Sequence, residues 1–380
     1  MKKLDTLCVH PIEKTATDQG AVAGAIFPSA AYNYLDGEDL RYPGFYTTYN
    51  QTKLGQILAN LEKGKWGMVY SSGMAAISTA ILTFVKQQEH VVFSRDLYGG
   101  TWKFAEKELP KRNIRFSYAD NTLESFRSKV KDDTRVIYLE TPSNPLLRLV
   151  PLAEIAAFAK ERGIVTIVDN TFASPVNQLP ITLGIDISVH SGTKYLGGHN
   201  DLPYGALIAA RPEHRDAIFS TAKLYGGSLS PYQCYLAEHA LKTLSLRIQK
   251  QNENALQLAQ FLEKHTKVER VYYPGLPAHP DHALARRQML GYGGMLSFEL
   301  AVAPERFSHF LRALRIIQPA LSLGGVESLI CSPAATSHIS LTAEERFSLV
   351  IKDNLLRLSA GIEHIDDLIN DIEQAIAGSI

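Results

Sequence analysis

Residues 189–199 read Val-His-Ser-Gly-Thr-Lys-Tyr-Leu-Gly-Gly-His and continue a β-rich apolar run at Ile185–His190. Lys194 therefore follows a predicted strand, among small and hydroxyl-bearing neighbours. A lysine in such a setting can lose its water, which lowers its pKa and makes its amine a nucleophile for carbonyl groups. The competing interpretation is an exposed surface lysine, which describes most lysines. The flanking residues Ser191, Gly192 and Thr193 favour the first interpretation.

Lys194 belongs to a series of β-rich runs that alternate with helical patterns between residue 67 and about residue 220. Segments such as Leu152–Arg162 carry apolar residues at helical spacing. This alternation predicts an α/β fold with a mostly parallel central sheet, covered on both faces and binding its ligands at the carboxyl ends of the strands. The predicted strands are Val91–Ser94, Ile114–Tyr118, Arg135–Leu139, Ile164–Asp169, Ile185–His190 and Gly205–Ala210.

The C-terminal part of the chain has a different pattern. A long helical stretch at 231–265 precedes isolated strands and a last helix at Ile365–Ile376. Because 380 residues exceed the ~250–300 at which single cores stop growing, we expect more than one domain. The expected divisions are an N-terminal arm (1–50) with little core of its own, a large domain (51–240) and a smaller α/β domain (241–380). The isolated strands are predicted at Val268–Tyr273, Met295–Leu300 and Leu355–Ser359.

Composition narrows the class of protein. Lys+Arg and Asp+Glu both number 39, whereas nucleic-acid or membrane-surface partners favour a basic excess. No apolar run approaches the ~18 residues of a membrane span, and no secretory signal pattern is visible. Cys8, Cys234 and Cys331 form no CxxC pair, which argues against a zinc site or a disulfide framework and favours a reducing compartment. We therefore expect a cytoplasmic protein without a metal site.

Two further junctions between strands and loops could serve a cofactor. At Tyr70–Ile77 a strand pattern gives way to small residues and a helix start, where backbone amides beside Gly73 could cradle a phosphate. An ordinary strand–helix turn explains the same pattern. At Ile164–Thr171 an apolar strand ends in Asp169, an acid that could pair with a cation or could only cap the next turn.

Arg357 lies inside the apolar strand pattern of Leu355–Gly361 and needs an anionic partner there. Its planar fork suits a substrate carboxylate, and a structural salt bridge is the alternative. A lysine, an acid, a phosphate cradle and an arginine are together the parts that a pyridoxal phosphate enzyme of amino acids needs. Asp169 precedes Lys194 by about one strand–helix–strand unit, so both can lie at one edge of the sheet.

The chain resembles the Cys/Met-metabolism family of pyridoxal-phosphate enzymes, which includes cystathionine γ-synthases, γ-lyases and β-lyases and methionine γ-lyase. The resemblance extends from about residue 20 to residue 376. Its motifs are S-S-G-M-A-A-I at 71–77, L-Y-G-G-T at 97–101, E-T-P-S-N-P at 140–145, V-D-N-T-F at 168–172, S-G-T-K-Y-L-G-G-H at 191–199, Y-P-G-L-P at 273–277, S-L-G-G-V-E-S-L at 322–329 and L-R-L-S-A-G-I-E at 356–363.

This resemblance implies fold type I, pyridoxal 5'-phosphate as the cofactor, and a homotetramer whose active sites are shared between subunits. It implies that Lys194 forms the imine with the cofactor and that Asp169 pairs with the pyridine nitrogen. Tyr98 would stack on the ring and help to move protons at the leaving group.

The phosphate would be held by Ser191, Thr193 and the amides of Gly73 and Met74. The ring oxygen and the substrate carboxylate would be held by Asn144, Ser328 and Arg357, with Glu327 beside them.

The N-terminal arm departs from the family pattern. Members of the family normally carry a Tyr-x-Arg there, whose side chains reach the phosphate in the neighbouring subunit. The best match here is Tyr42-Pro43-Gly44, and Tyr46-Thr47-Thr48 is the alternative. Both lack the arginine. Tyr42 is the predicted phosphate tyrosine, and the missing arginine bears on cofactor affinity.

These observations predict an enzyme that makes or breaks carbon–sulfur bonds in cystathionine-like amino acids, either as a γ- or β-lyase or as a γ-replacement synthase. Methionine γ-lyases usually carry a reactive cysteine at the position of Gly100, so its absence argues against that activity. An aminotransferase of the same fold is an alternative. A paralogue that binds a cofactor or partner without turnover is a third hypothesis, which the missing arginine motivates.

Overall fold

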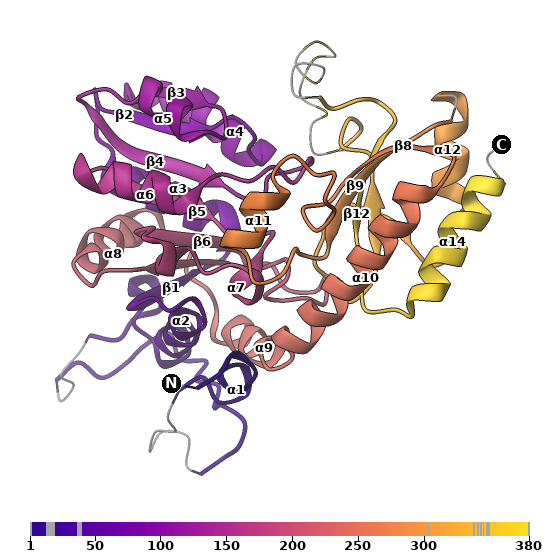
Figure 1. The fold of residues 1–380 in the computed structure, drawn as a ribbon. Coiled ribbons are helices and arrows are strands. Elements are labelled where there is room, and N and C mark those ends of the chain that lie inside the picture. The colour runs from indigo at the N-terminus through magenta and orange to yellow at the C-terminus, as the bar shows by residue number, and fades with distance from the viewer. Residues whose placement is uncertain are drawn as a thin grey trace.

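The computed structural model describes residues 2–12, 20–35, 40–302, 304–336, 339, 342, 344, 346 and 350–378. Two sheets lie side by side in it, and the long helix α10 (Leu244–Lys264) runs past the smaller one, as Figure 1 shows. Each sheet is covered by its own helices. Lys194 and Arg357 lie in different sheet units, so the contact between the two units determines the site.

The larger sheet orders its seven described strands β1-β7-β6-β5-β4-β2-β3. Strands β2 to β6 are parallel, whereas β7 pairs antiparallel with β6 and β1. This arrangement confirms the predicted α/β fold with a mostly parallel sheet. The strands are β1 (Trp66–Tyr70), β2 (His90–Ser94), β3 (Arg115–Ala119), β4 (Thr134–Glu140), β5 (Val165–Asp169), β6 (Ile187–Ser191) and β7 (Gly205–Ala209).

Helices cover both faces of this sheet, because successive side chains of its strands alternate between two apolar layers. On one face, Ile167 and Val189 pack with residues of α3, α4 and α8. On the other face, Val168 packs with α5 and α6, and Ile208 packs with α2 and α9. These helices are α2 (Tyr49–Glu62), α3 (Gly73–Phe84), α4 (Gly99–Glu108), α5 (Leu123–Lys129), α6 (Leu152–Glu161), α8 (His214–Tyr225) and α9 (Pro231–Leu241), with the short α7 (Ser174–Asn177) and 3-10 turns at Pro110–Arg112 and Pro180–Leu183.

The smaller sheet orders its five described strands β10-β11-β12-β9-β8. One face packs Phe298, Leu356 and Leu358 against α10, α12 and α14. By the alternation of a strand, Arg357 lies on the opposite face. The strands are β8 (Val268–Tyr272), β9 (Met295–Leu300), β10 (Gln318–Pro319), β11 (Leu329–Cys331) and β12 (Leu355–Ser359), and the helices are α11 (His282–Gln288), α12 (Pro304–Ala313) and α14 (Ile365–Ala377).

Two sequence-based expectations about helices need correction. The stretch at 231–265 is two helices, α9 and α10, because the chain turns at Lys242–Thr243. Arg247 stabilises this break by donating from Nη2 to the Ala240 carbonyl at 3.0 Å. The N-terminal arm, whose Gly, Pro and Tyr content predicts an irregular segment, is not irregular throughout, since α1 (Leu4–Val9) is helical and buries Leu7 and Cys8, and a 3-10 turn forms at Pro43–Phe45.

Three further observations concern membrane helices, metal clusters and the cysteines. Within the described ranges, no helix is long and apolar enough to cross a membrane. The same residues contain no cluster of three or more His, Cys, Asp or Glu side chains arranged to hold a metal ion. Cys8, Cys234 and Cys331 are free and buried.

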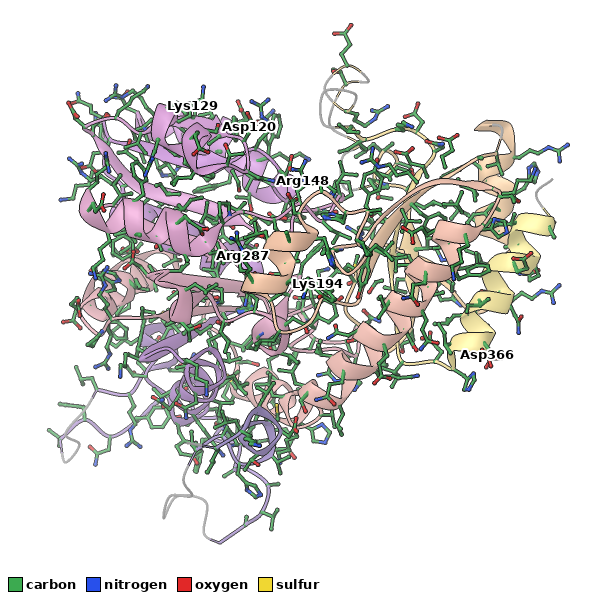
Figure 2. All side chains as sticks on the ribbon, viewed as in Figure 1. Asp120, Lys129, Arg148, Lys194, Arg287 and Asp366 are labelled. Carbon is green, nitrogen blue, oxygen red and sulfur yellow. The ribbon has the colours of Figure 1, made fainter. Side chains whose placement is uncertain are left out.

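Asp371 gives a test of the smaller unit, because its buried carboxylate accepts hydrogen bonds from three consecutive backbone amides at 2.8–2.9 Å, those of Arg315, Ile316 and Ile317. Asp371→Ala leaves these amides unpaired, and we expect a loss of about 2–4 kcal/mol in the free energy of unfolding. Denaturant unfolding measures the loss. Asp366→Ala on the exposed side of the same helix (Figure 2) is the control, with less than about 1 kcal/mol expected. Equal losses in the two variants would contradict this account of Asp371.

Candidate active site

Lys194 lies in the turn after β6, at the junction between the two sheet units (Figure 2). Its side chain reaches across the junction, and Nζ donates a hydrogen bond to Ser322 Oγ at 3.0 Å. Burial lowers the pKa of the Lys194 amine to about 8, and the positive charge of Arg357 contributes in the same direction. The unprotonated fraction of the amine near neutral pH is therefore larger than that of an ordinary lysine, as a nucleophile or base requires.

Arg357 is buried in β12 and faces the same junction. Its Nη1 donates to Asn144 Oδ1 and its Nη2 to the Ser322 carbonyl, both at 3.1 Å. Its Nε is buried with no hydrogen-bond partner among the described residues. Both observed partners are neutral oxygens. A guanidinium held in this way retains affinity for an anion such as a carboxylate.

The loop that carries Ser322 is held tightly against the lysine segment. Gly324 has φ +76°, and a Cβ at this position would lie 2.7 Å from the backbone nitrogen of Tyr195. The Gly324 amide donates to Ser359 Oγ at 2.8 Å, two residues beyond Arg357 on β12. Only glycine allows both the left-handed backbone and this close approach. Ser322 is thereby placed between Lys194 and Arg357.

Asp169 ends β5 and is connected to the lysine segment through Thr171. The Asp169 carboxylate accepts from the backbone amide of Thr171 at 3.0 Å and from its hydroxyl. The Thr171 hydroxyl oxygen in turn accepts from the Ser191 amide at 2.8 Å. Burial raises the pKa of the Asp169 carboxyl, because the charged form is desolvated. A cation placed beside it would favour the ionised form.

The helix start predicted at Gly73 is present in the structure. Gly73 is the first residue of α3, and the Ser72 hydroxyl caps the helix by accepting from the Ala75 amide at 3.2 Å. A Cβ on Gly73 would lie 2.9 Å from Ser191 Cβ, so the helix start and the end of β6 approach closely there. The free amides of a helix N-terminus favour an anion. Among the other predicted residues, Met74 lies next to Gly73 in α3, and the Thr193 hydroxyl bonds to the backbone of Tyr204.

Tyr98 precedes α4, and its side chain is half exposed. Its backbone amide donates to the buried carboxylate of Glu140 at 2.6 Å. A Cβ at Gly100 would lie 2.4 Å from Tyr98 Cε1 and 3.1 Å from Met74 Sδ. A cysteine at position 100 would therefore displace the Tyr98 ring from this position.

Three residues that were predicted from the sequence to belong to the site make no described contact with Lys194. The Ser328 hydroxyl bonds to Glu363 and to the Gly361 amide, at 2.9 and 2.8 Å. Glu327 is exposed and accepts from Asn200 at 2.8 Å. The exposed Tyr42 packs on Phe45, with ring centroids 5.1 Å apart. The alternative tyrosine, Tyr46, is buried and donates its hydroxyl to the Gly226 carbonyl within its own chain.

Two residues of the site were missed from the sequence, Ser322 and Thr171. Both lie inside motifs already quoted, S-L-G-G-V-E-S-L and V-D-N-T-F. The choice between Ser322 and Ser328 depends on how the loop folds over Lys194, which no pattern of spacing predicts. Thr171 follows Asp169 by two residues, a spacing at which a hydroxyl commonly bonds to a neighbouring acid.

The residues present fit pyridoxal phosphate. The helix N-terminus at Gly73 presents backbone amides that favour an anion, the buried acid Asp169 suits a cationic ring nitrogen, and Lys194 has the lowered pKa that imine formation with an aldehyde needs. The unpartnered Nε of Arg357 is available to an amino-acid carboxylate. Asp169 ends β5, Lys194 follows β6, Gly73 begins α3 and Arg357 lies in β12. These groups are far apart in the sequence, and the fold brings them together.

Comparison with known proteins gives a consistent result. The profile of the family described as Cys/Met metabolism PLP-dependent enzyme matches residues 5–377. The chain is 40% identical over 380 residues to a cystathionine beta-lyase of Lactococcus lactis subsp. cremoris and to a cystathionine gamma-lyase of Bacillus subtilis, with 99% of each chain covered. The structure matches that of cystathionine gamma synthase from Xanthomonas oryzae pv. oryzae in complex with cystathionine, with a TM-score of 0.94, 36% identity and coverage of 100% of this chain and 99% of that one.

The lowered pKa of Lys194 predicts a distinct reactivity. In the cofactor-free protein, we expect acetylation of Lys194 by limiting acetic anhydride to reach half its maximal rate near pH 8, because its amine is unprotonated above that pH. Peptide mass spectrometry across a pH series measures the rate, with the exposed Lys129 as internal reference. Arg357→Gln removes a nearby positive charge and shifts the Lys194 midpoint to higher pH. The same pH profile for Lys194 and Lys129 would contradict this assignment.

Proposed function

The chain belongs to the family of Cys/Met metabolism PLP-dependent enzymes, and within it we propose a lyase that binds pyridoxal phosphate at Lys194 and breaks carbon–sulfur bonds of cystathionine-like substrates. The protein is an enzyme of the cystathionine lyase and γ-synthase type. The observation that carries the proposal is the contact of Lys194 and Arg357 with one serine, Ser322. The lyase names of the relatives at 40% identity support elimination over replacement.

In this proposal, residues at the carboxyl ends of β4, β5 and β6 and at the start of α3 hold the cofactor. Asp169 faces the ring nitrogen, and its ionised form is favoured by a cation there. Ser191 and the Gly73 and Met74 amides bind the phosphate at the start of α3, together with the Thr193 segment. Asn144 lies beside Arg357, where its amide group can contact the ring oxygen as well as the substrate.

The substrate is held by its carboxylate. Arg357 offers Nε to one carboxylate oxygen, and its guanidinium is kept in place by Asn144 and the Ser322 carbonyl. The substrate amine then lies on the Lys194 side of the junction. This orientation presents the α-carbon to Lys194 and directs the sulfur-bearing chain toward Tyr98.

Proton transfer is assigned to two residues. Bound pyridoxal phosphate supplies an electron sink that stabilises negative charge at the substrate α-carbon. Lys194 Nζ takes the α-proton, and its pKa of about 8 suits a base that must work near neutral pH. Tyr98, half exposed beside Gly100, gives a proton to the departing sulfur. Ser322 holds Lys194 Nζ on the side where the α-carbon lies.

Assembly and location are part of the same proposal. We place the protein in the cytoplasm as a homotetramer that takes small amino-acid substrates and neither nucleic acid nor membrane as partners. The exposed apolar residues Leu224, Tyr232 and Leu236 on α8 and α9 support burial against another copy. Exposed Tyr42 can then reach a neighbouring subunit's phosphate. The three free cysteines support a reducing compartment.

The proposed activity is tested with a panel of amino acids that includes cystathionine, cysteine, methionine and O-acylated homoserines. We expect cystathionine to yield ammonia, a keto acid and a thiol amino acid, which are assayed separately. Lys194→Ala is expected to lose nearly all of this turnover. Replacement of an O-acyl group by cysteine without ammonia release would instead identify a synthase. A keto acid formed from cystathionine with neither ammonia nor a thiol product would identify an aminotransferase, and no turnover of any substrate would support the non-catalytic alternative.

Arg357→Lys tests the carboxylate site. One ammonium cannot reproduce the planar fork, so we expect KM for cystathionine to rise by about 10–100-fold, which corresponds to the loss of one charge-assisted hydrogen bond of about 1.5–3 kcal/mol. Steady-state kinetics measure the change. Arg287→Lys on the exposed face of α11 (Figure 2) is the matched control and is expected to leave KM unchanged. An unchanged KM in Arg357→Lys would remove Arg357 from the substrate site.

A further inference from the structure

A buried acid and a buried histidine meet on the far side of the larger sheet. Glu62, the last residue of α2, and His190 of β6 are both almost fully buried, and Glu62 Oε1 lies 2.5 Å from His190 Nε2. Asp169 and Ser191 belong to the α3 face of the sheet by the alternation of their strands, whereas His190 belongs to the α2 face. The pair therefore lies behind the residues assigned to the cofactor.

This pair is connected to the carboxyl ends of three strands. Asn170, which follows Asp169, donates from Nδ2 to Glu62 Oε1 at 2.9 Å. Asn170 and Gln178 exchange hydrogen bonds at 2.9 and 3.0 Å. Gln178 also donates to the carbonyl of Thr141, next to the end of β4, at 3.1 Å. One buried network thus joins the ends of β4, β5 and β6, which carry the residues Asn144, Asp169 and Lys194.

Burying this acid and this histidine together costs free energy, so we expect the pair to contribute to the fold or to the site. A carboxylate at the C-terminal end of a helix opposes the helix dipole, and burying a charge is costly. Glu62 Oε2 and His190 Nδ1 are buried without a described hydrogen-bond partner. His190 must carry a proton on Nε2 to donate to Glu62 Oε1. Across the sheet, burial raises the pKa of the Asp169 carboxyl, and His190 acts in the opposite direction.

We propose that Glu62 and His190 are positioning residues for the reaction: they hold the ends of β5 and β6 in register and maintain the charge of Asp169 from behind. The inference rests on the proposed function, since it assumes that Asp169 faces the cofactor. It adds that the Glu62 carboxylate couples helix α2, which follows the N-terminal arm, to the cofactor site.

Glu62→Gln tests the proposal, because glutamine keeps an oxygen for Asn170 and removes the charge. In the holoenzyme, we expect the exchange of the substrate α-proton with deuterium to slow by about 10–100-fold and the cofactor dissociation constant to rise by at least about tenfold, with KM unchanged. The matched control is Asp186→Asn. The Asp186 carboxylate also bridges β5 and β6, accepting from the Thr166 amide and hydroxyl at 2.9 Å, but at the opposite end of these strands.

The two variants separate positioning from stability. A purely structural role predicts that both lower the melting temperature and that neither changes exchange or cofactor affinity in the folded holoenzyme, which would overturn the proposal. If Glu62→Gln does not fold, His190→Gln, which retains an N–H toward Glu62, is expected to show the same slowed exchange. Wild-type protein that exchanges no α-proton, or Lys194→Ala that still does, would instead refute the proposed function and leave this inference without its premise.

Discussion

The positive charges of Lys194 and Arg357 share one polar junction between the two sheets, and the rest of the site depends on this arrangement. Ser322 accepts from Lys194 through its hydroxyl and from Arg357 through its carbonyl. Among the described residues, neither cation forms an ion pair with an acid. Partial burial weakens solvent screening there, and the repulsion is relieved if Lys194 gives up its proton or an anion binds. Loss of the proton leaves an amine at Lys194 that can act as a base. Binding of an anion makes Arg357 a carboxylate site.

The larger sheet complements this positive junction with acids. Glu140 and Asp169 end neighbouring parallel strands in register, and both are buried. Burial and mutual repulsion raise the pKa of Glu140, and burial raises that of Asp169. The site is thus polarised, with cations at the junction between the two sheets and acids at the edge of the larger one. Such a field suits a ligand that carries a negative carboxylate and a positive ring nitrogen on separate parts.

The sequence predicted the class of the fold because strand and helix patterns depend on local periodicity. It predicted Lys194, Asp169 and Arg357 because each lies at or in an apolar strand, where a charged side chain is conspicuous. It could not predict Ser322, since the position of that serine depends on a loop that only Gly324 allows to approach Lys194. The break between α9 and α10 was missed for a similar reason, because it is stabilised by a tertiary contact and not by a helix-stop residue.

The most direct test of this account locates the cofactor on the chain. The holoenzyme, loaded with pyridoxal phosphate, is reduced with borohydride, digested and sequenced by mass spectrometry. The account predicts a single phosphopyridoxyl modification, on Lys194, and its loss when a substrate amino acid is present during reduction. A modification on another lysine, or none, would contradict the assignment of the junction between the sheets as the active site.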